Sequence, residues 1–235
     1  MMAIAAVLFD KDGTLIDVNG TWVPFYKAML KQEQGLSAAA VEAKMVATGL
    51  DPVSNTFRAG STLAGGTTRQ LVEAWWPDAT ADDHAAITYR LDHDYGALAL
   101  SYMTPLMPLA PVLTELQSLG LRLGVATNDG EASAKRHMRA LKVDHFFDAI
   151  LGADSVAIPK PSGQMVRQFA EWVGMEPGDI AMVGDNTHDL EEARNGGAGL
   201  AIGVLTGNAE RHHLEPHADL VLDSIAELAD FFRGL

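Results

Sequence analysis

The sequence predicts an α/β protein, with a Rossmann-like, doubly wound parallel sheet as its core and an inserted all-helical domain. Apolar runs of strand length alternate with helical patterns between residue 108 and the C-terminus. Another such run, residues 3–9, lies near the N-terminus. The roughly ninety residues between these parts have helical periodicity and no strand pattern. We therefore expect a core of residues 1–15 and 108–235, and a helical domain of residues 16–107.

Composition and charge limit the classes of function. The 235 residues suffice for a core domain with a smaller second domain. Hydrophobic residues make up 48% and charged residues 20% of the chain, which is typical of a packed globular protein. The formal net charge of −14 argues against binding to nucleic acids or anionic membranes. An anionic substrate remains compatible with this charge, because a local cationic pocket can override the global field.

The compartment is also predictable. The chain has no cysteine, which excludes disulfides, thiolate metal sites and cysteine nucleophiles. No apolar run approaches the roughly 18 residues of a membrane span. The N-terminal run is too short for a signal peptide and has no basic residue before it. We expect a cytoplasmic protein, either a monomer or a homodimer.

The N-terminal apolar run ends in two acidic residues, and the rest of the site is predicted around them. A short apolar run bounded by turn residues is typical of a buried parallel strand, so Asp10 falls at its carboxyl end, where α/β sheets bind ligands. On extended backbone Asp10 and Asp12 can point to one side, with Lys11 opposite. Two carboxylates at so short a separation repel each other and require a divalent cation or a shared proton. The alternative is an ordinary polar turn, since Asp-Gly pairs are common in turns.

The inserted block is expected to be helical. Its predicted elements are a helix with an apolar stripe over residues 22–33, a helix over 38–48 capped by Ser37, a loop over 51–66 and a helix over 67–76. A capping pair of Thr80 with Asp83 predicts the start of a long helix over 80–102. We expect linkers at residues 16–20 and 103–108, and two connections of this kind permit a hinge.

Strands and helices alternate in the remainder of the chain. The strands are expected at residues 121–126, 149–151, 180–183, 200–204 and 220–222. The helices are expected at residues 109–119, 131–141, 161–173, 190–195 and from 224 to about 233. This alternation predicts a parallel sheet with helices on both of its faces.

Polar side chains follow several of these strands. They are Asp10 with Asp12, Thr127 with Asn128, Lys160 between two prolines, and Asp185 with Asp189. A single aspartate at a strand end is usually a helix cap, and a lysine between prolines is usually a loop residue. The carboxyl ends of parallel strands converge on one edge, so the group as a whole indicates a site. Carboxylates suit Mg²⁺, while a hydroxyl and a lysine suit phosphoryl oxygens, so the inventory favours phosphoryl transfer.

These motifs resemble those of a known family. Asp10-Lys11-Asp12-Gly13-Thr14, Thr127-Asn128, Lys160-Pro161 and Gly184-Asp185 with Asp189 occur in the order of the four motifs of the haloacid dehalogenase (HAD) superfamily. The resemblance covers nearly the whole chain, and the insert resembles the α-helical cap of the phosphoglycolate phosphatase-like branch. It implies a Mg²⁺-dependent phosphatase that hydrolyses a small-molecule phosphomonoester, with 2-phosphoglycolate as the first candidate.

The resemblance also implies roles for the first and last motifs. Asp10 would be the nucleophile that forms an aspartyl-phosphate. Asp12 would protonate the leaving alcohol and then activate water. Asp10, Asp185 and the backbone carbonyl of Asp12 would ligate Mg²⁺. Dehalogenases and phosphonate hydrolases that resemble this chain lack a carboxylate at the position of Asp12, so its presence favours phosphate esters, whose alkoxide leaving group needs a proton.

The two middle motifs and the last aspartate would support this chemistry. Thr127 and the amide of Asn128 would hold the phosphoryl oxygens, and Lys160 would steady the nucleophile and neutralise charge. Asp189 would not bind the metal directly but would orient a metal-bound water or Lys160. One departure from the family pattern is Gly163, which stands where a second proline usually follows the lysine motif and puts the rigidity of this loop in question.

Several further residues have two interpretations each. Arg58 lies in the flexible loop of the insert and either meets an anionic group of the substrate or is a solvated loop arginine. His188 lies within the fourth motif and is expected to be an exposed residue at a helix start rather than a neighbour of the metal. Trp22, Phe25 and Tyr26 are expected to pack in the core of the insert rather than to face substrate.

Two other functions remain open from the sequence. A sugar phosphomutase of the same superfamily would return the phosphoryl group to the sugar instead of to water. A phospho-receiver signalling module also uses Asp, Thr and Lys at strand ends, but it predicts about half this length and no large insert. Product analysis with a hexose 1-phosphate separates the mutase from the phosphatase.

Overall fold

The computed structural model describes residues 4–234, and a parallel sheet organises its larger part. Within the described residues, six strands form this sheet in the order β5-β4-β1-β6-β7-β8, and every neighbouring pair is parallel. The strands are β1 (Ala6–Phe9), β4 (Arg122–Ala126), β5 (Ala149–Leu151), β6 (Ile180–Gly184), β7 (Leu200–Val204) and β8 (Leu220–Leu222). The order reverses on either side of β1, which is where a doubly wound sheet opens a crevice at its carboxyl edge.

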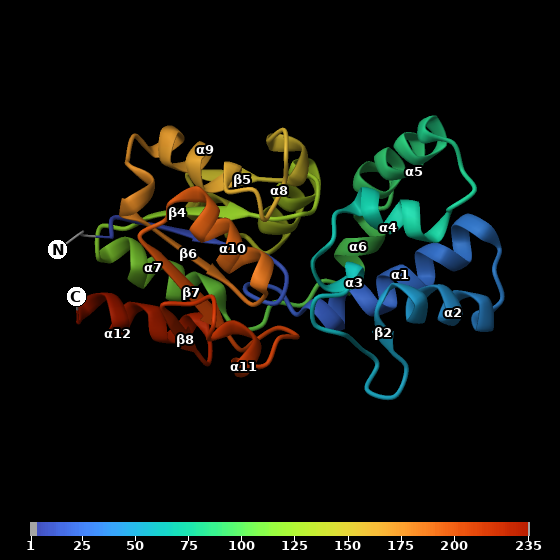
Figure 1. Ribbon diagram of the computed structural model, residues 1–235, viewed down its shortest axis with the longest axis horizontal. Coiled ribbons are helices and arrows are strands. Elements are labelled where there is room, and N and C mark those ends of the chain that lie inside the picture. The colour runs from blue at the N-terminus through green and yellow to red at the C-terminus, as the bar shows by residue number, and fades with distance from the viewer. Residues whose placement is uncertain (1–3, 235) are drawn as a thin grey trace.

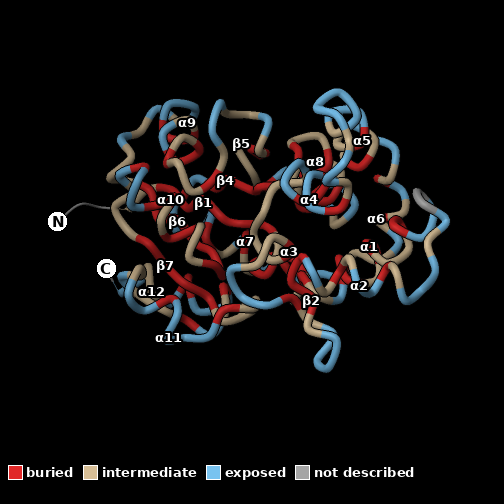
Figure 2. The backbone as a smooth tube through the Cα atoms, turned by 45° about the vertical axis from the view of Figure 1, so that its right-hand side comes forward, coloured by how far each residue is buried: buried red, intermediate tan, exposed pale blue. Residues whose placement is uncertain are grey.

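Helices cover both faces of the sheet because its strands are apolar on both sides. Val7 and Phe9 face one hydrophobic cluster, whereas Ala6 and Leu8 face another, and all four are fully buried. The first cluster is covered by α7 (Leu109–Ser118), α8 (Glu131–Ala140) and α12 (Leu228–Arg233). The second is covered by α9 (Gln164–Val173), α10 (Thr187–Gly196) and α11 (Arg211–Leu214). The predicted α/β fold class is confirmed, and Figure 2 shows the strands as the buried centre of this part.

Short 3-10 helices complete the connections of this part. They are η1 (Asp144–Phe146), η2 (Ala153–Ser155), η3 (Pro177–Asp179) and η4 (Ile225–Glu227). Most predicted bounds agree with the structure to within one to three residues. The first strand begins at Ala6, and Ala3, where it was expected to begin, lies outside the described residues. Across the described part of the chain, no helix is both long and apolar enough to span a bilayer.

The insert forms a second group of helices, which lies on the right in Figure 1. Its helices are α1 (Val18–Gln34), α2 (Ala38–Thr48), α3 (Thr62–Gly65), α4 (Thr68–Trp75), α5 (Ala81–His93) and α6 (Gly96–Tyr102). They enclose a hydrophobic cluster of their own, which includes Trp22, Met29, Met45 and Trp75. Ser37 and Thr80 accept hydrogen bonds from backbone amides at two helix starts, as predicted, and Thr67 caps α4 in the same way.

The insert departs from the prediction in three places. Two strands, β2 (Leu50–Asp51) and β3 (Thr56–Phe57), form a small antiparallel hairpin in the predicted loop. The predicted long helix is broken between His93 and Gly96, where a Cβ on Gly96 would lie 2.7 Å from Nε of Arg136 in α8. The expected linker at residues 16–20 is too long, because α1 begins at Val18 and Asp17 caps it by accepting a hydrogen bond from Gly20 N at 2.9 Å.

Candidate active site

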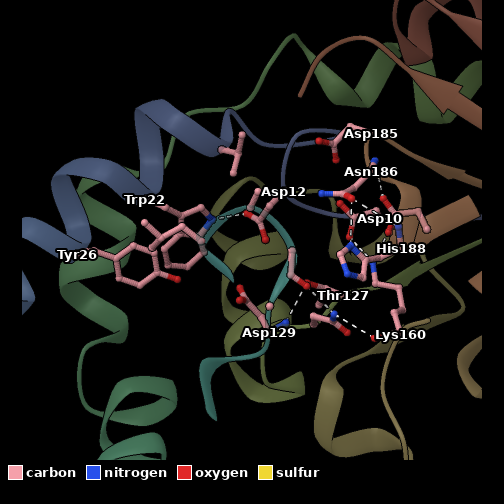
Figure 3. A pocket seen from close by; sticks show the side chains of 17 residues that line it. Asp10, Asp12, Trp22, Tyr26, Thr127, Asp129, Lys160, Asp185, Asn186 and His188 are labelled. Carbon is pink, nitrogen blue, oxygen red and sulfur yellow. Dashed lines mark hydrogen bonds and ion pairs between the residues drawn. The ribbon is translucent and has the colours of Figure 1, made fainter. Parts of the chain in front are cut away.

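A small pocket of about 50 Å³ lies between the carboxyl edge of the sheet and the insert. Asp10 follows β1, Thr127 follows β4 and Asp185 follows β6, so neighbouring strands deliver these side chains to one place. Trp22 and Tyr26 of α1 line the opposite side, as Figure 3 shows. The structure therefore brings together residues that are far apart in the sequence, as expected from a parallel sheet.

Lys160 occupies the centre of a buried ionic cluster. Its Nζ donates to Asp10 Oδ1 at 2.6 Å, to Asp189 Oδ1 at 2.6 Å and to the carbonyl oxygen of Ala126 at 2.9 Å. Burial lowers the pKa of Lys160, but Asp10 and Asp189 outweigh it and raise this pKa above its usual value, so the lysine is charged. Burial raises the pKa of Asp10 to about 6, and repulsion by Asp189 adds to this rise, although Lys160 lowers the pKa.

A cluster of carboxylates next to this lysine has the chemistry of a cation site. Oxygen atoms of Asp10, Asp185 and Asp189, all buried, lie within 4.8 Å of one another. Burial and then repulsion by Asp10 and Asp189 raise the pKa of Asp185 well above its usual range. Hard oxygen donors that repel one another in a buried place fit a divalent cation such as Mg²⁺.

The backbone around Asp185 is shaped to hold its carboxyl group. A Cβ on Gly13 would lie 2.5 Å from the Asp185 carboxyl carbon, and Gly13 has a φ of +87°. A Cβ on Gly207 would lie 1.7 Å from Asp185 Oδ2. Both positions therefore require glycine: each allows close approach of the backbone, and Gly13 also allows the left-handed turn after the first motif.

Asp12 faces a different direction from this carboxylate cluster. Trp22 Nε1 donates to Asp12 Oδ1 at 2.5 Å, and the ammonium of Lys11 pairs with Oδ2. The expectation that Lys11 points away from Asp12 is wrong, because β1 ends at Phe9 and strand alternation does not continue through the turn. Burial raises the pKa of Asp12 to about 6, although Lys11 lowers it.

Thr127 and Asn128 line the pocket and follow β4. Both residues are buried, and Asn128 Nδ2 donates to the carbonyl oxygen of Gly65 in α3 at 2.8 Å. The other amide atom, Asn128 Oδ1, has no protein partner. Asn128 thereby connects the sheet edge to the insert directly above the pocket.

The loop that carries Lys160 is held by a residue that the sequence reasoning missed. Glu192 of α10 is fully buried and accepts hydrogen bonds from Gly163 N at 2.5 Å, Met165 N at 2.8 Å and Val166 N at 3.2 Å. These amides include the start of α9, which a carboxylate stabilises. The signal for Glu192 is its position three residues after Asp189, on the same face of one helix.

The structure places four of the residues that have two interpretations each. Arg58 is exposed, follows β3 and does not line the pocket. His188 does line the pocket, is half-buried, and contacts Asn186 Oδ1 through Nδ1 at 3.0 Å. Burial and then the charge of Lys160 lower the pKa of His188, which favours its neutral form. Trp22 and Tyr26 both line the pocket and pack in the cluster of the insert.

The fold and the motif positions match a known family. A family model described as haloacid dehalogenase-like hydrolase matches residues 4–197, and the chain belongs to this family of hydrolases. The resemblance stated from the motifs is confirmed, and membership in a hydrolase family argues against the phospho-receiver alternative.

Individual relatives extend this comparison. The chain is 30% identical to the phosphoglycolate phosphatase of Neisseria meningitidis over 232 residues, covering 96% of this chain and 92% of that protein. It is 25% identical to the pyrophosphatase PpaX of Bacillus cereus, covering 97% and 95%. A crystal structure described as a predicted phosphoglycolate phosphatase from Haemophilus somnus has a TM-score of 0.74 at 20% identity, covers 98% of each chain, and supports the fold.

Proposed function

We propose that this hydrolase is a Mg²⁺-dependent phosphatase that cleaves a small phosphomonoester through an aspartyl-phosphate on Asp10. The observation that carries this proposal is the buried contact of Asp10 Oδ1 with Lys160 Nζ at 2.6 Å, within the cluster of Asp10, Asp185 and Asp189. An aspartate held by a lysine beside other carboxylates is oriented as a nucleophile, and Lys160 offsets the charge of an incoming phosphoryl group.

The chain's own residues divide the first chemical step between them. Asp10 attacks phosphorus while the bond between phosphorus and the ester oxygen breaks, and Asp12 gives a proton to that oxygen. Thr127 and the backbone amide of Asn128, both of which line the pocket, hold the phosphoryl oxygens. The second step reverses the proton flow, because Asp12 takes a proton from the water that attacks the aspartyl-phosphate.

The acidic cluster supplies the ligands for the metal in this proposal. Asp10, Asp185 and the backbone carbonyl of Asp12 would hold Mg²⁺, which supplies positive charge against the phosphoryl oxygens when bound. Asp189 acts through Lys160, since its Oδ1 accepts from Lys160 Nζ at 2.6 Å while its Oδ2 accepts from Asn186 N at 3.0 Å. Both oxygens of Asp189 therefore have protein partners, which favours a role in orienting Lys160.

The insert is proposed to act as a cap over the site. Residues 16–107 contribute Trp22, Tyr26 and the segment 63–66 to the pocket lining, so any substrate is enclosed between the two parts. The small pocket favours a small leaving group. Because relatives include proteins named phosphoglycolate phosphatase, 2-phosphoglycolate is the first substrate to test. The cytoplasmic location and the monomer or homodimer state stay predictions.

Phosphate release with purified protein tests the proposal. We expect release from a small phosphomonoester with Mg²⁺, no release after chelation, and loss of turnover in Asp10→Asn. The panel should contain 2-phosphoglycolate, pyrophosphate and hexose phosphates, because relatives include proteins named pyrophosphatase. Conversion of a hexose 1-phosphate into a 6-phosphate would support the mutase instead. Wild-type turnover in Asp10→Asn would refute the role of Asp10.

A further inference from the structure

We propose that Lys11 and Trp22 are positioning residues, which fix the carboxyl group of Asp12 in the direction needed for proton transfer, and that Asp129 holds Lys11 in place. This inference rests on the proposed function, in which Asp12 is the proton donor and acceptor. The motif comparison assigns no role to Lys11, Trp22 or Asp129.

Lys11 is an unusual residue for its location. It immediately follows the nucleophile, yet it is fully buried and does not line the pocket. Its ammonium pairs with Asp12 Oδ2 and with Asp129 Oδ2, the latter at 2.8 Å, and lies 4.9 Å from the centre of the Trp22 ring. A buried ammonium with two carboxylates and an aromatic face is held in one orientation, because any other would leave its charge without a partner.

Trp22 holds the other oxygen of the same carboxyl group. Its Nε1 donates to Asp12 Oδ1 at 2.5 Å, and Figure 3 shows the indole nitrogen directed at Asp12 from α1. The two oxygens of Asp12 are thus held by different parts of the protein, one by the turn after β1 and the other by the insert. Rotation of this carboxyl group would break one or both contacts.

Asp129 completes the arrangement from β4. It follows Thr127 and Asn128, and the Thr127 hydroxyl accepts a hydrogen bond from its backbone amide at 3.2 Å. Its carboxylate gives Lys11 a second anion, so the lysine is not neutralised by Asp12 alone. His137 closes the far side with its ring 5.6 Å from that of Trp22 and is 1% exposed. The partners that hold the proton carrier are therefore themselves buried and fixed in place.

This frame has a defined consequence for the reaction. When the bond between phosphorus and the ester oxygen breaks, the proton of Asp12 moves to that oxygen and leaves Asp12 as a carboxylate. Lys11 and Trp22 both donate to this carboxylate, so they keep it oriented for the following transfer from water. Misorientation should slow reactions whose leaving group needs a proton, and it should spare those whose leaving group does not.

The test compares two substrates in Lys11→Met. We expect the loss of kcat/KM to be about tenfold greater for an alkyl phosphomonoester than for p-nitrophenyl phosphate. This difference is only part of the rate enhancement that a general acid contributes, because Asp12 itself is still present. The p-nitrophenolate ion leaves without protonation, so any loss of kcat/KM for p-nitrophenyl phosphate reports general damage to the site. Lys44→Met is the matched control, because Lys44 also donates a hydrogen bond, to the carbonyl oxygen of Trp75, and lies over an indole ring, that of Trp76. It should leave the ratio unchanged.

Trp22→Phe provides an independent variant, since it keeps the aromatic ring and removes the N–H donor. It should shift the substrate ratio in the same direction as Lys11→Met. Its matched control is Trp75→Phe, which removes a buried indole N–H that donates to Thr48 Oγ1 at 3.1 Å, away from the pocket.

Lys11→Arg keeps the positive charge at this position. Its substrate ratio should therefore lie between those of Lys11→Met and the wild type.

A double variant separates positioning from folding. Lys11→Met leaves Asp12 and Asp129 without their shared cation, so thermal stability should fall, and adding Asp129→Asn should restore part of it. The substrate ratio should stay altered in the double variant, because Asp12 still lacks Lys11. Equal losses for both substrates, or a ratio that recovers with stability, would overturn the inference. Turnover of p-nitrophenyl phosphate by Asp10→Asn would instead overturn the proposed function.

Discussion

Removal of the Glu192 carboxylate should destabilise the loop that carries Lys160. Three backbone amides, those of Gly163, Met165 and Val166, donate to this carboxylate inside the protein. Each buried amide left without an acceptor costs about 1–3 kcal/mol, and water entering the vacated space recovers part of this, so we expect Glu192→Ala to lose about 3–5 kcal/mol. Glu192→Gln keeps one carbonyl oxygen and should lose about 1–2 kcal/mol.

Urea unfolding measures the loss, and hydrogen exchange locates it. Exchange at the amides of Met165 and Val166 should accelerate more than exchange in β1 or β6. Glu191→Ala is the matched control, because Glu191 is the adjacent glutamate of α10 and accepts none of these bonds. A Glu192→Ala variant as stable as Glu191→Ala would refute the reasoning. Lower phosphate release is also expected, since Lys160 belongs to the same loop.

Two further predictions concern ionisation. Burial, followed by the charge of Lys11, lowers the pKa of His137 from 6.5 to about 3, so the unfolded chain binds a proton that the folded chain does not, and stability is lost as pH falls through this window. His137→Phe should lose less stability between about pH 7.5 and about pH 5, measured by urea midpoints, and an equal loss would contradict the assignment. Mg²⁺ at about a hundred times its Kd should stabilise the wild type by about 2.7 kcal/mol, but Asp185→Asn much less. Without metal, Asp185→Asn should have a higher Tm than the wild type, because it removes one of three crowded carboxylates. Thermal unfolding with and without Mg²⁺ measures both effects, and the surface control Asp230→Asn should behave like the wild type under both conditions.

Local pattern predicted the strands and most helices correctly because their periodicity and caps depend only on residues that are close together in the sequence. The run before Asp10 and the capping pair of Thr80 and Asp83 are examples. The convergence of Asp10, Thr127 and Asp185 was also predictable, since parallel strands place their carboxyl ends at one edge. The hairpin at β2 and β3 was missed because two-residue strands have too few residues to show a period.

Within the candidate site, the sequence by itself determined that the carboxylates, Thr127 and Lys160 meet at one edge of the sheet, and the tertiary structure decided how each is held and what else surrounds them. Lys11 was expected to point away from Asp12, but the turn after Phe9 changes its direction and the packing of α1 brings Trp22 to the same carboxyl group. The role of Glu192 was not predicted, and the sequence left both interpretations of Arg58 open until the structure showed this residue to be exposed. The physical reason is that the position of a strand or helix along the chain follows from local pattern, whereas the partner of a buried charge depends on packing between segments that are distant along the chain.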